Sequence, residues 1–197
     1  QKISSNGTVS TYNLVHTTSY AYYGAVLNAS GEIHFIPHDA NRGQKIDING
    51  VVSTYSLVYT ALAAYYGGVL SPNGDIHFVP YQFAAVGQKI SPAGVVSTYS
   101  LVYTGGGYES GVLAPNGDIH FVPSVATVGQ KVSATGVVST YSLAYTTVNG
   151  ANSGGTLAPN GDIHFVPYAA AVGQKIQTQS GVKWYKGVCM SPYFNKY

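Results

Sequence analysis

The sequence predicts an all-β fold built from four-stranded antiparallel sheets, and two observations lead to this prediction. First, a segment of about 43 residues recurs along the chain, each copy marked by Gln-Lys-Ile or Gln-Lys-Val, with lysines at Lys2, Lys45, Lys89, Lys131 and Lys175. Second, each copy contains short segments rich in β-branched and aromatic residues, whereas no segment has the apolar period of a helix. Four short strands in a repeat of this length are typical of one blade of a β-propeller.

The copy that starts at Gln88 shows the expected order of strands. Gln88-Lys89-Ile90 is the first, and a Pro-Ala-Gly turn leads to the second, at residues 95–104. A variable segment follows, and then the third strand at residues 111–113 and the fourth at residues 118–123. Asn116-Gly117 lies between the last two apolar runs, and Asn-Gly is a strong signal for a tight hairpin turn because both residues tolerate positive φ.

The ends of the chain indicate how many blades there are. We name the strand types A (Gly-Val-Leu), B (Ile-His-Phe-Val), C (Gln-Lys-Ile) and D (Val-Ser-Thr-Tyr-Ser-Leu), with A expected innermost because it is short, apolar and begins with glycine. Residues 2–16 match C and D, and residues 187–197 match A and a degenerate B. We therefore predict a single domain over residues 1–197, a five-bladed β-propeller whose fifth blade combines the N-terminal and C-terminal strands and closes the ring. The repeats cover about residues 1–43, 44–87, 88–129, 130–173 and, as a partial copy, 174–197.

Two alternatives to this architecture stay open. The fourth blade has a stunted outer strand at residues 182–185, and if those residues formed strand D, the ring would stay open with four and a half blades. A β-trefoil or a β-sandwich is the other alternative, but neither explains several near-identical four-strand repeats.

Composition excludes several classes of protein. Charged residues are 8% and the net charge is +2, without a basic run that would neutralise nucleic-acid phosphates, so we expect no nucleic-acid partner. No apolar stretch approaches the ~20 residues that span a bilayer, so no membrane span is expected. Cys189 stands alone and cannot form an internal disulfide. No signal peptide is visible at the N-terminus, which leaves a secreted or processed origin open.

The repeat resembles a group of tandem β-propeller proteins from bacteriophage and environmental sequences. The resemblance rests on the run Gly-Gly-Val-Leu-Ser-Pro-Asn-Gly-Asp-Ile-His-Phe-Val-Pro at residues 67–80, on its copies at Gly111 and Gly154, and on the ending at residues 191–196. It implies a propeller in an extracellular or virion-associated location, and it transfers no catalytic residue.

Strand B repeats an acid two residues before a histidine, as in Asp75 and His77, with further copies at Glu32/His34, Asp118/His120 and Asp162/His164. Both side chains point to one side of the strand, which would suit a metal ligand pair or an acid/base pair. The copies stand in different blades, however, and a metal site needs three or four ligands around one ion. We expect a structural network in each blade, in which Asp, Ser or Thr holds the histidine. We expect the repeated lysine to pair with the repeated acid of its own or of the next blade. We expect no metal, no cofactor and no enzymatic activity.

The connections from D to A and from B to C vary between repeats, whereas the A-to-B and C-to-D turns are uniform. In an up-and-down blade the variable connections emerge on one face, where loops held by a rigid scaffold can recognise ligands. The predicted function is therefore a non-enzymatic, lectin-like propeller, an adhesin or virion surface module that binds glycans or host-surface polysaccharide through repeated weak sites. The alternative is a structural or protein-docking part of a virion or surface fibre, with other virion proteins as partners. The predicted ligand-binding residues are Tyr22, Tyr23, His38, Asp39, Arg42, Tyr65, Tyr66, Tyr81, Tyr108, Glu109, Asn152 and Tyr168.

Overall fold

The computed structural model describes residues 1–146 and 150–178, and all regular secondary structure in those ranges is β-strand. The strands are β1 Lys2–Ile3, β2 Val9–Ser10, β3 Tyr22–Leu27, β4 Ile33–Pro37, β5 Arg42–Ile46, β6 Val52–Ser56, β7 Tyr65–Leu70, β8 Ile76–Pro80, β9 Val86–Ile90, β10 Val96–Ser100, β11 Tyr108–Leu113, β12 Ile119–Pro123, β13 Val128–Val132, β14 Val138–Ser142, β15 Asn152–Leu157, β16 Asp162–Pro167 and β17 Lys175–Gln177. In these same ranges there is no helix long and apolar enough to cross a membrane.

Each repeat forms its own antiparallel sheet in which strands neighbouring in sequence pair with one another. The orders are β3-β4-β5-β6, β7-β8-β9-β10 and β11-β12-β13-β14, and a three-stranded sheet β15-β16-β17 follows. This is the predicted A-B-C-D order, and we call these sheets blades one to four. At the N-terminus, β1 and β2 pair as the predicted C and D strands.

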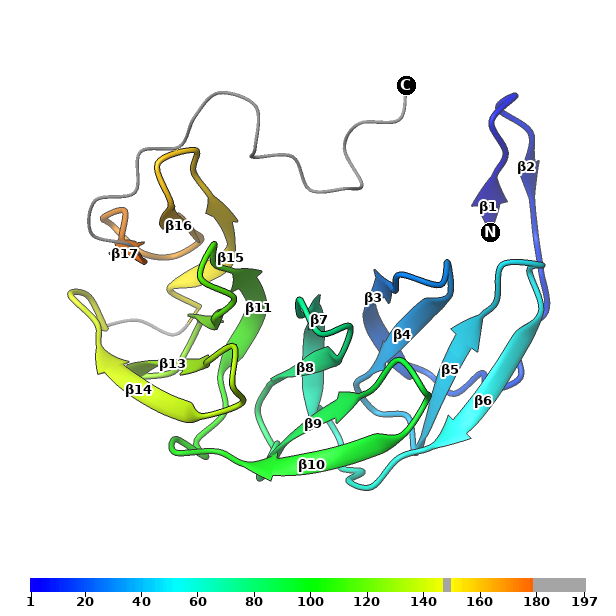
Figure 1. Cartoon of the computed structure of the whole chain (residues 1–197), viewed down its shortest axis with the longest axis horizontal. Coiled ribbons are helices and arrows are strands. Elements are labelled where there is room, and N and C mark those ends of the chain that lie inside the picture. Colours follow the sequence, from blue (N-terminus) through cyan, green and yellow to red (C-terminus); the bar gives the residue numbers. More distant parts are fainter. Residues whose placement is uncertain (147–149, 179–197) are drawn as a thin grey trace.

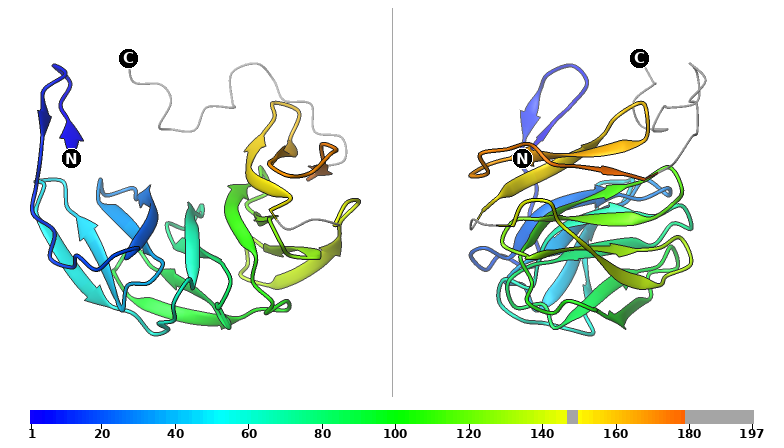
Figure 2. Two further views of the ribbon diagram at one scale, coloured as in Figure 1. Left: turned by 180° about the vertical axis from the view of Figure 1, so that it is seen from behind. Right: turned by 90° about the vertical axis from the view of Figure 1, so that its left-hand side faces the viewer.

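The blades follow one another around an arc, with the A strands β3, β7, β11 and β15 on its inner side (Figure 1). The β1–β2 hairpin and blade four lie at opposite ends of this arc (Figure 2). The sheets do not close into a ring within the described residues, so the predicted count of five blades is not established. The segments on which closure depends, residues 182–185 and 187–197, lie outside those residues.

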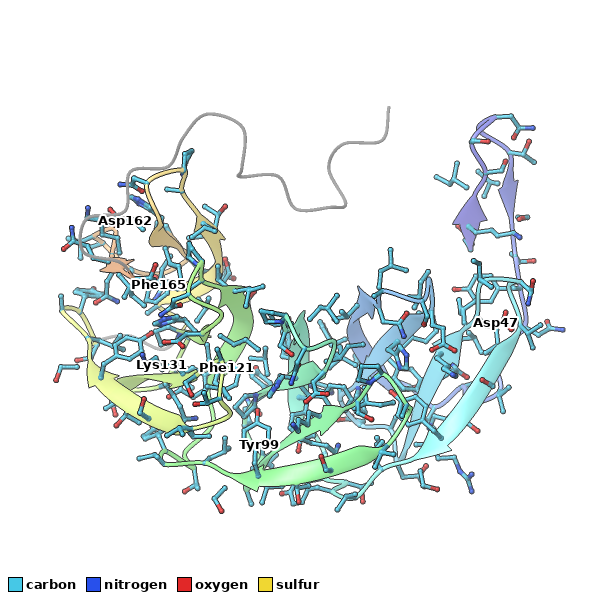
Figure 3. All side chains as sticks on the ribbon, in the orientation of Figure 1. Asp47, Tyr99, Phe121, Lys131, Asp162 and Phe165 are labelled. Carbon is cyan, nitrogen blue, oxygen red and sulfur yellow. The ribbon has the colours of Figure 1, made fainter. Side chains whose placement is uncertain are left out.

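Successive blades are held together by apolar side chains on strands B and C. In blade two, Ile76, Phe78 and Ile90 are buried against Ile36 of blade one. Phe121 and Phe165 occupy the same position in blades three and four and lie between neighbouring sheets (Figure 3). Since each such side chain contributes about 1.5–3 kcal/mol when buried, these interfaces stabilise the arc.

In each of the three four-stranded blades, a tyrosine of strand D covers a glycine of strand C. Gly87 pairs with Tyr99 of strand D, and a Cβ atom at residue 87 would stand 2.1 Å from Cε2 of the tyrosine ring. Gly43 with Tyr55 and Gly129 with Tyr141 repeat this arrangement. The tyrosine ring therefore lies flat over the glycine and directs its hydroxyl toward strand B.

A buried glutamine joins each blade to the chain segment that precedes it. The Gln88 side chain is fully buried, and its Oε1 accepts hydrogen bonds from the backbone N–H groups of Val58 at 3.0 Å and Tyr59 at 2.8 Å. The equivalent glutamines bind the equivalent pairs, Gln44 with Val15 and His16, Gln130 with Val102 and Tyr103, and Gln174 with Ala144 and Tyr145. One side-chain oxygen thus satisfies two backbone donors where the chain passes between blades.

We expect Gln88→Met to lower the free energy of unfolding by roughly 2–4 kcal/mol, because two backbone donors lose their acceptor at ~1–3 kcal/mol each. Urea unfolding followed by circular dichroism measures the change. Thr98→Ala, at the exposed residue of β10 directly opposite Gln88, is the control and should stay within about 0.5 kcal/mol of the parent. Equal stability of Gln88→Met and the control would contradict this role of the glutamine.

Candidate functional site

The variable connections meet at one end of the blades, as the sequence predicts. The backbone N–H of Tyr81, in the B-to-C connection of blade two, donates to the carbonyl oxygen of Ala64, in the D-to-A connection, at 2.7 Å. Ser124 with Gly107, and Tyr168 with Ala151, repeat this bond. The paired connections form a continuous variable face.

Four aromatic side chains gather on the variable face where blades one and two meet, and we call them the tyrosine cluster: Tyr23, His38, Tyr66 and Tyr81. The rings of Tyr23 and Tyr66 are stacked, with centroids 4.3 Å apart. The Tyr81 centroid lies 4.8 Å from that of Tyr66, and the His38 centroid lies 5.1 Å from that of Tyr23. All four side chains are only partly buried or are exposed, so their rings form an accessible aromatic surface.

The repeat itself brings these residues together. Tyr23 and Tyr66 are the second residues of the innermost strands β3 and β7, and His38 and Tyr81 each follow the proline that ends strand B. Equivalent positions of neighbouring blades lie side by side, so an aromatic residue at both positions in two consecutive repeats produces one cluster.

Two carboxylates lie beside the cluster. Asp39 Oδ1 is 2.8 Å from His38 Nδ1 and accepts a hydrogen bond from the backbone N–H of Ala63. Glu109 occupies in blade three the position that Tyr66 has in blade two, and its Oε1 accepts a hydrogen bond from the Ser124 hydroxyl at 2.8 Å. Burial, the neighbouring Tyr23 hydroxyl and the charge of Glu109 raise the pKa of Tyr66 to about 12, so this phenol stays protonated at neutral pH.

Several other predicted residues lie inside the blades. Tyr65 and Tyr108, the first residues of β7 and β11, are buried, and their hydroxyls donate to the carbonyl oxygens of Val86 and Val128. Tyr22 has the same position in β3, and its hydroxyl donates to the carbonyl oxygen of Arg42. These three phenols join strand A to strand C within one blade, which is a structural role.

The remaining predicted residues are separate from the cluster. Asn152 is buried in blade four, where its Nδ2 donates to the carbonyl oxygen of Pro123 at 2.8 Å. Tyr168 is 79% exposed on the same blade, and Arg42 is exposed at the start of β5. The structure therefore gathers Tyr23, His38, Asp39, Tyr66 and Tyr81, with Glu109 close by, and leaves the others elsewhere.

In blades two and three the repeated acid and histidine of strand B belong to two different pairs, whereas in blade one His34 Nε2 also lies 3.5 Å from Glu32 Oε2. Lys89 Nζ lies 2.6 Å from Asp75 Oδ2, and the corresponding lysine and acid pair in blades one, three and four, so of the two pairings that the sequence left open, the lysine takes the acid of its own blade. His77 Nδ1 lies 3.3 Å from the hydroxyl oxygen of Tyr99, whose ring covers Gly87. In the sequence, the glycine of strand C and the tyrosine of strand D recur in each complete repeat, and this recurrence could have pointed to the tyrosine as the partner of the histidine. Residues 1–146 and 150–178 contain no group of three or more His, Cys, Asp or Glu side chains placed to hold a metal ion.

Comparison with solved structures identifies the fold. The chain is similar to virginiamycin B lyase from Staphylococcus aureus, with 21% identity, a TM-score of 0.64 and coverage of 82% of this chain and 56% of that one. A streptogramin B lyase matches with 24% identity, a TM-score of 0.65 and coverage of 79% and 53%. An auxiliary nutrient binding protein from Bacteroides thetaiotaomicron matches with 11% identity, a TM-score of 0.53 and coverage of 75% and 36%. The fold is a β-propeller.

These matches have limits that decide what is carried over. The chain spans about half the length of the lyases that it matches. No protein-family model and no curated protein matches the sequence. At identities below a quarter, the likeness carries the fold and no functional residue.

The prediction that the chain has no enzymatic activity is contradicted by the comparison with solved structures. It rested on the lack of a catalytic motif in the sequence, but solved structures with the same fold are lyases. Blades place side chains from distant repeats next to one another, so a catalytic group on this scaffold need not form a contiguous motif.

The strand B histidines predict a pH dependence of stability. Burial, aided by the nearby lysine charge, lowers the pKa of His77 and of His120 to about 4. The unfolded chain takes up these protons near pH 6.5, whereas the folded chain takes them up only near pH 4. The free energy of unfolding therefore has its full value above about pH 6.5 and falls by roughly 2–3 kcal/mol for each histidine as the pH drops toward 4. Urea unfolding at about pH 7.5 and pH 4.5 tests this, and His77→Gln should flatten the dependence. An unchanged slope in that variant would contradict the assignment.

Proposed function

We propose that the chain is a carbohydrate-binding β-propeller whose binding surface is the tyrosine cluster. The observation that carries the proposal is the contiguous aromatic surface of Tyr23, His38, Tyr66 and Tyr81 at the meeting point of two blades. A phenol ring packs against the apolar face of a sugar ring, while its hydroxyl bonds to sugar hydroxyls.

Polar groups at the edge of the cluster suit the same ligand. Asp39 and Glu109 are acceptors for sugar hydroxyls, and each carboxylate is already held in place by one hydrogen bond, from Ala63 and from Ser124. The cluster lies on strands and on short connections tied to strand A, so little order has to be gained on binding. The proposed partner is a glycan or polysaccharide of a host surface, and the proposed location is extracellular or on a virion surface.

Tyr66→Ala should weaken glycan binding about tenfold or more, corresponding to ~1.4 kcal/mol, because it removes the ring that contacts both Tyr23 and Tyr81. A glycan array identifies bound sugars, and calorimetry against them measures the affinity. The matched control is Tyr168→Ala, which removes an exposed tyrosine from the position in blade four equivalent to Tyr81. Equal losses in both variants, or no glycan bound by the parent protein, would refute the proposal.

The architecture within this proposal is a closed ring of five blades. Support comes from the face of blade one that points away from blade two, where Ile33 is 37% exposed, whereas Ile76 and Ile119 at the same position are each 1% exposed. A hollow of about 620 Å³ lies along this face, lined by residues of the N-terminal segment and of blade one, among them Leu14, Tyr22 and Phe35. β1 and β2 supply strands C and D at this end, so two further strands would complete a blade there.

Residues 187–197 are the proposed source of those two strands, because their sequence matches A and B. Deleting them should lower the melting temperature markedly and cause self-association, since each buried apolar side chain contributes ~1.5–3 kcal/mol and open sheet edges pair. Light scattering and thermal unfolding measure both effects. A truncated protein that stays monomeric and melts like the parent would refute closure within one chain, and would favour the alternative in which another protein docks on this face.

A further inference from the structure

A second recess lies at the end of the blades opposite the tyrosine cluster. It is a cleft of about 380 Å³ between blades two and three, at the small end of the ~300–1,000 Å³ range of small-molecule sites. Its walls come from the uniform turns, namely the A-to-B turn of blade two at residues 71–73 and the C-to-D turn of blade three at residues 133–136. His77 and Lys89 of blade two also line it.

The imidazole of His77 lines this cleft, and one of its two nitrogens has no hydrogen-bond partner within residues 1–146 and 150–178. Its Nδ1 lies 3.3 Å from the hydroxyl oxygen of Tyr99, and no other hydrogen bond of this ring is found in the described part of the chain. Burial and the charge of Lys89 keep the pKa of His77 near 4, so the ring is neutral at pH 7. A neutral imidazole can donate or accept one hydrogen bond at Nε2, depending on its tautomer.

The other groups give the cleft balanced charge and mixed polarity. Lys89 Nζ is paired with Asp75 Oδ2 at 2.6 Å, so the ammonium is neutralised by its neighbour. Ser133 and Thr135 contribute hydroxyls that lie 2.9 Å from each other, and Pro72 contributes an apolar surface. Hydroxyl donors and acceptors beside an apolar patch, without net charge, suit a sugar ring better than an anion.

We infer that this cleft is a separate binding site for a neutral hydroxylated ligand, the terminal monosaccharide of a glycan, with His77 as a hydrogen-bond partner. The assignment is independent of the tyrosine cluster, because the two sites lie at opposite ends of the blades and share no residue.

Blade one shows what closes such a site. Its histidine, His34, has Nε2 3.5 Å from Glu32 Oε2 and 3.4 Å from Asn28 Nδ2. Blade two has the shorter Asp75 and Ser71 at these two positions, so Nε2 of His77 is left open. His120 of blade three follows the pattern of His77, with Nδ1 3.3 Å from the Tyr141 hydroxyl and an aspartate in place of glutamate.

The experiment records imidazole ¹⁵N–¹H spectra of the full chain, labelled on histidine, during addition of D-glucose, D-galactose, D-mannose or N-acetyl-D-glucosamine. Single His→Gln variants at residues 34, 38, 77 and 120 assign the signals. With sugar at about 100 mM, enough to fill a site with a Kd of about 10 mM, at least one sugar should shift the His77 signal and leave that of His34 in place. Shifts at His38 report on the tyrosine cluster, so failure at one site is distinguished from failure at the other.

The matched variant transfers the blade-one residues into blade two. Ser71→Asn with Asp75→Glu keeps the acid that pairs with Lys89 but should bring a carboxylate and an amide to Nε2 of His77. The sugar-dependent shift of His77 should then fall to less than a tenth of its parent value, while unfolding by urea stays cooperative. No shift at His77 with any of the four sugars, a shift with inorganic phosphate in place of sugar, or a shift that survives the double substitution would overturn the assignment.

Discussion

A glutamine side chain buried between blades is the interaction on which the rest of the arrangement depends. Gln88 Oε1 holds two consecutive backbone N–H groups of the segment that leaves blade one, and the same bond recurs at Gln44, Gln130 and Gln174. Because each glutamine lies in strand C or, for Gln174, directly before it, and the donors belong to the preceding D-to-A connection, the bond fixes one sheet relative to the next. With that geometry fixed, Phe78 reaches Ile36, and Tyr66 reaches Tyr23.

The repeat made most of the fold predictable. A strand was expected at residues 118–123, and the structure has β12 at Ile119–Pro123, because a turn with Asn-Gly and a terminal proline mark both ends in the sequence. The A-B-C-D order of strands was predicted from the same turn and proline signals. Closure was predicted from the two ends of the chain, and it depends on residues that the structure does not describe.

The candidate site was predictable only in part, because adjacent residues of a strand point to opposite sides. Tyr65 and Tyr66 are indistinguishable by residue type, yet Tyr65 is buried within its blade and Tyr66 is part of the accessible cluster. An irregular register between Tyr65 and Gly67 adds a local shift that a sequence pattern does not reveal. The glutamine bond was missed as well, since the repeated glutamine bonds to backbone groups about 30 residues away, which a local sequence pattern does not reveal.

The difference between Glu32 and Asp75 has a consequence for how a repeated protein changes its valency. In blade one both Glu32 and Asn28 lie near the imidazole of His34, whereas blade two has Asp75 and Ser71 at these positions, and the ion pair with the lysine persists in both blades. If the proposed cleft binds a sugar, two substitutions within one blade can therefore open or close it while the lysine pair of that blade stays in place. Duplication of the repeat multiplies the cleft, and later substitutions of this kind can close it in one blade at a time.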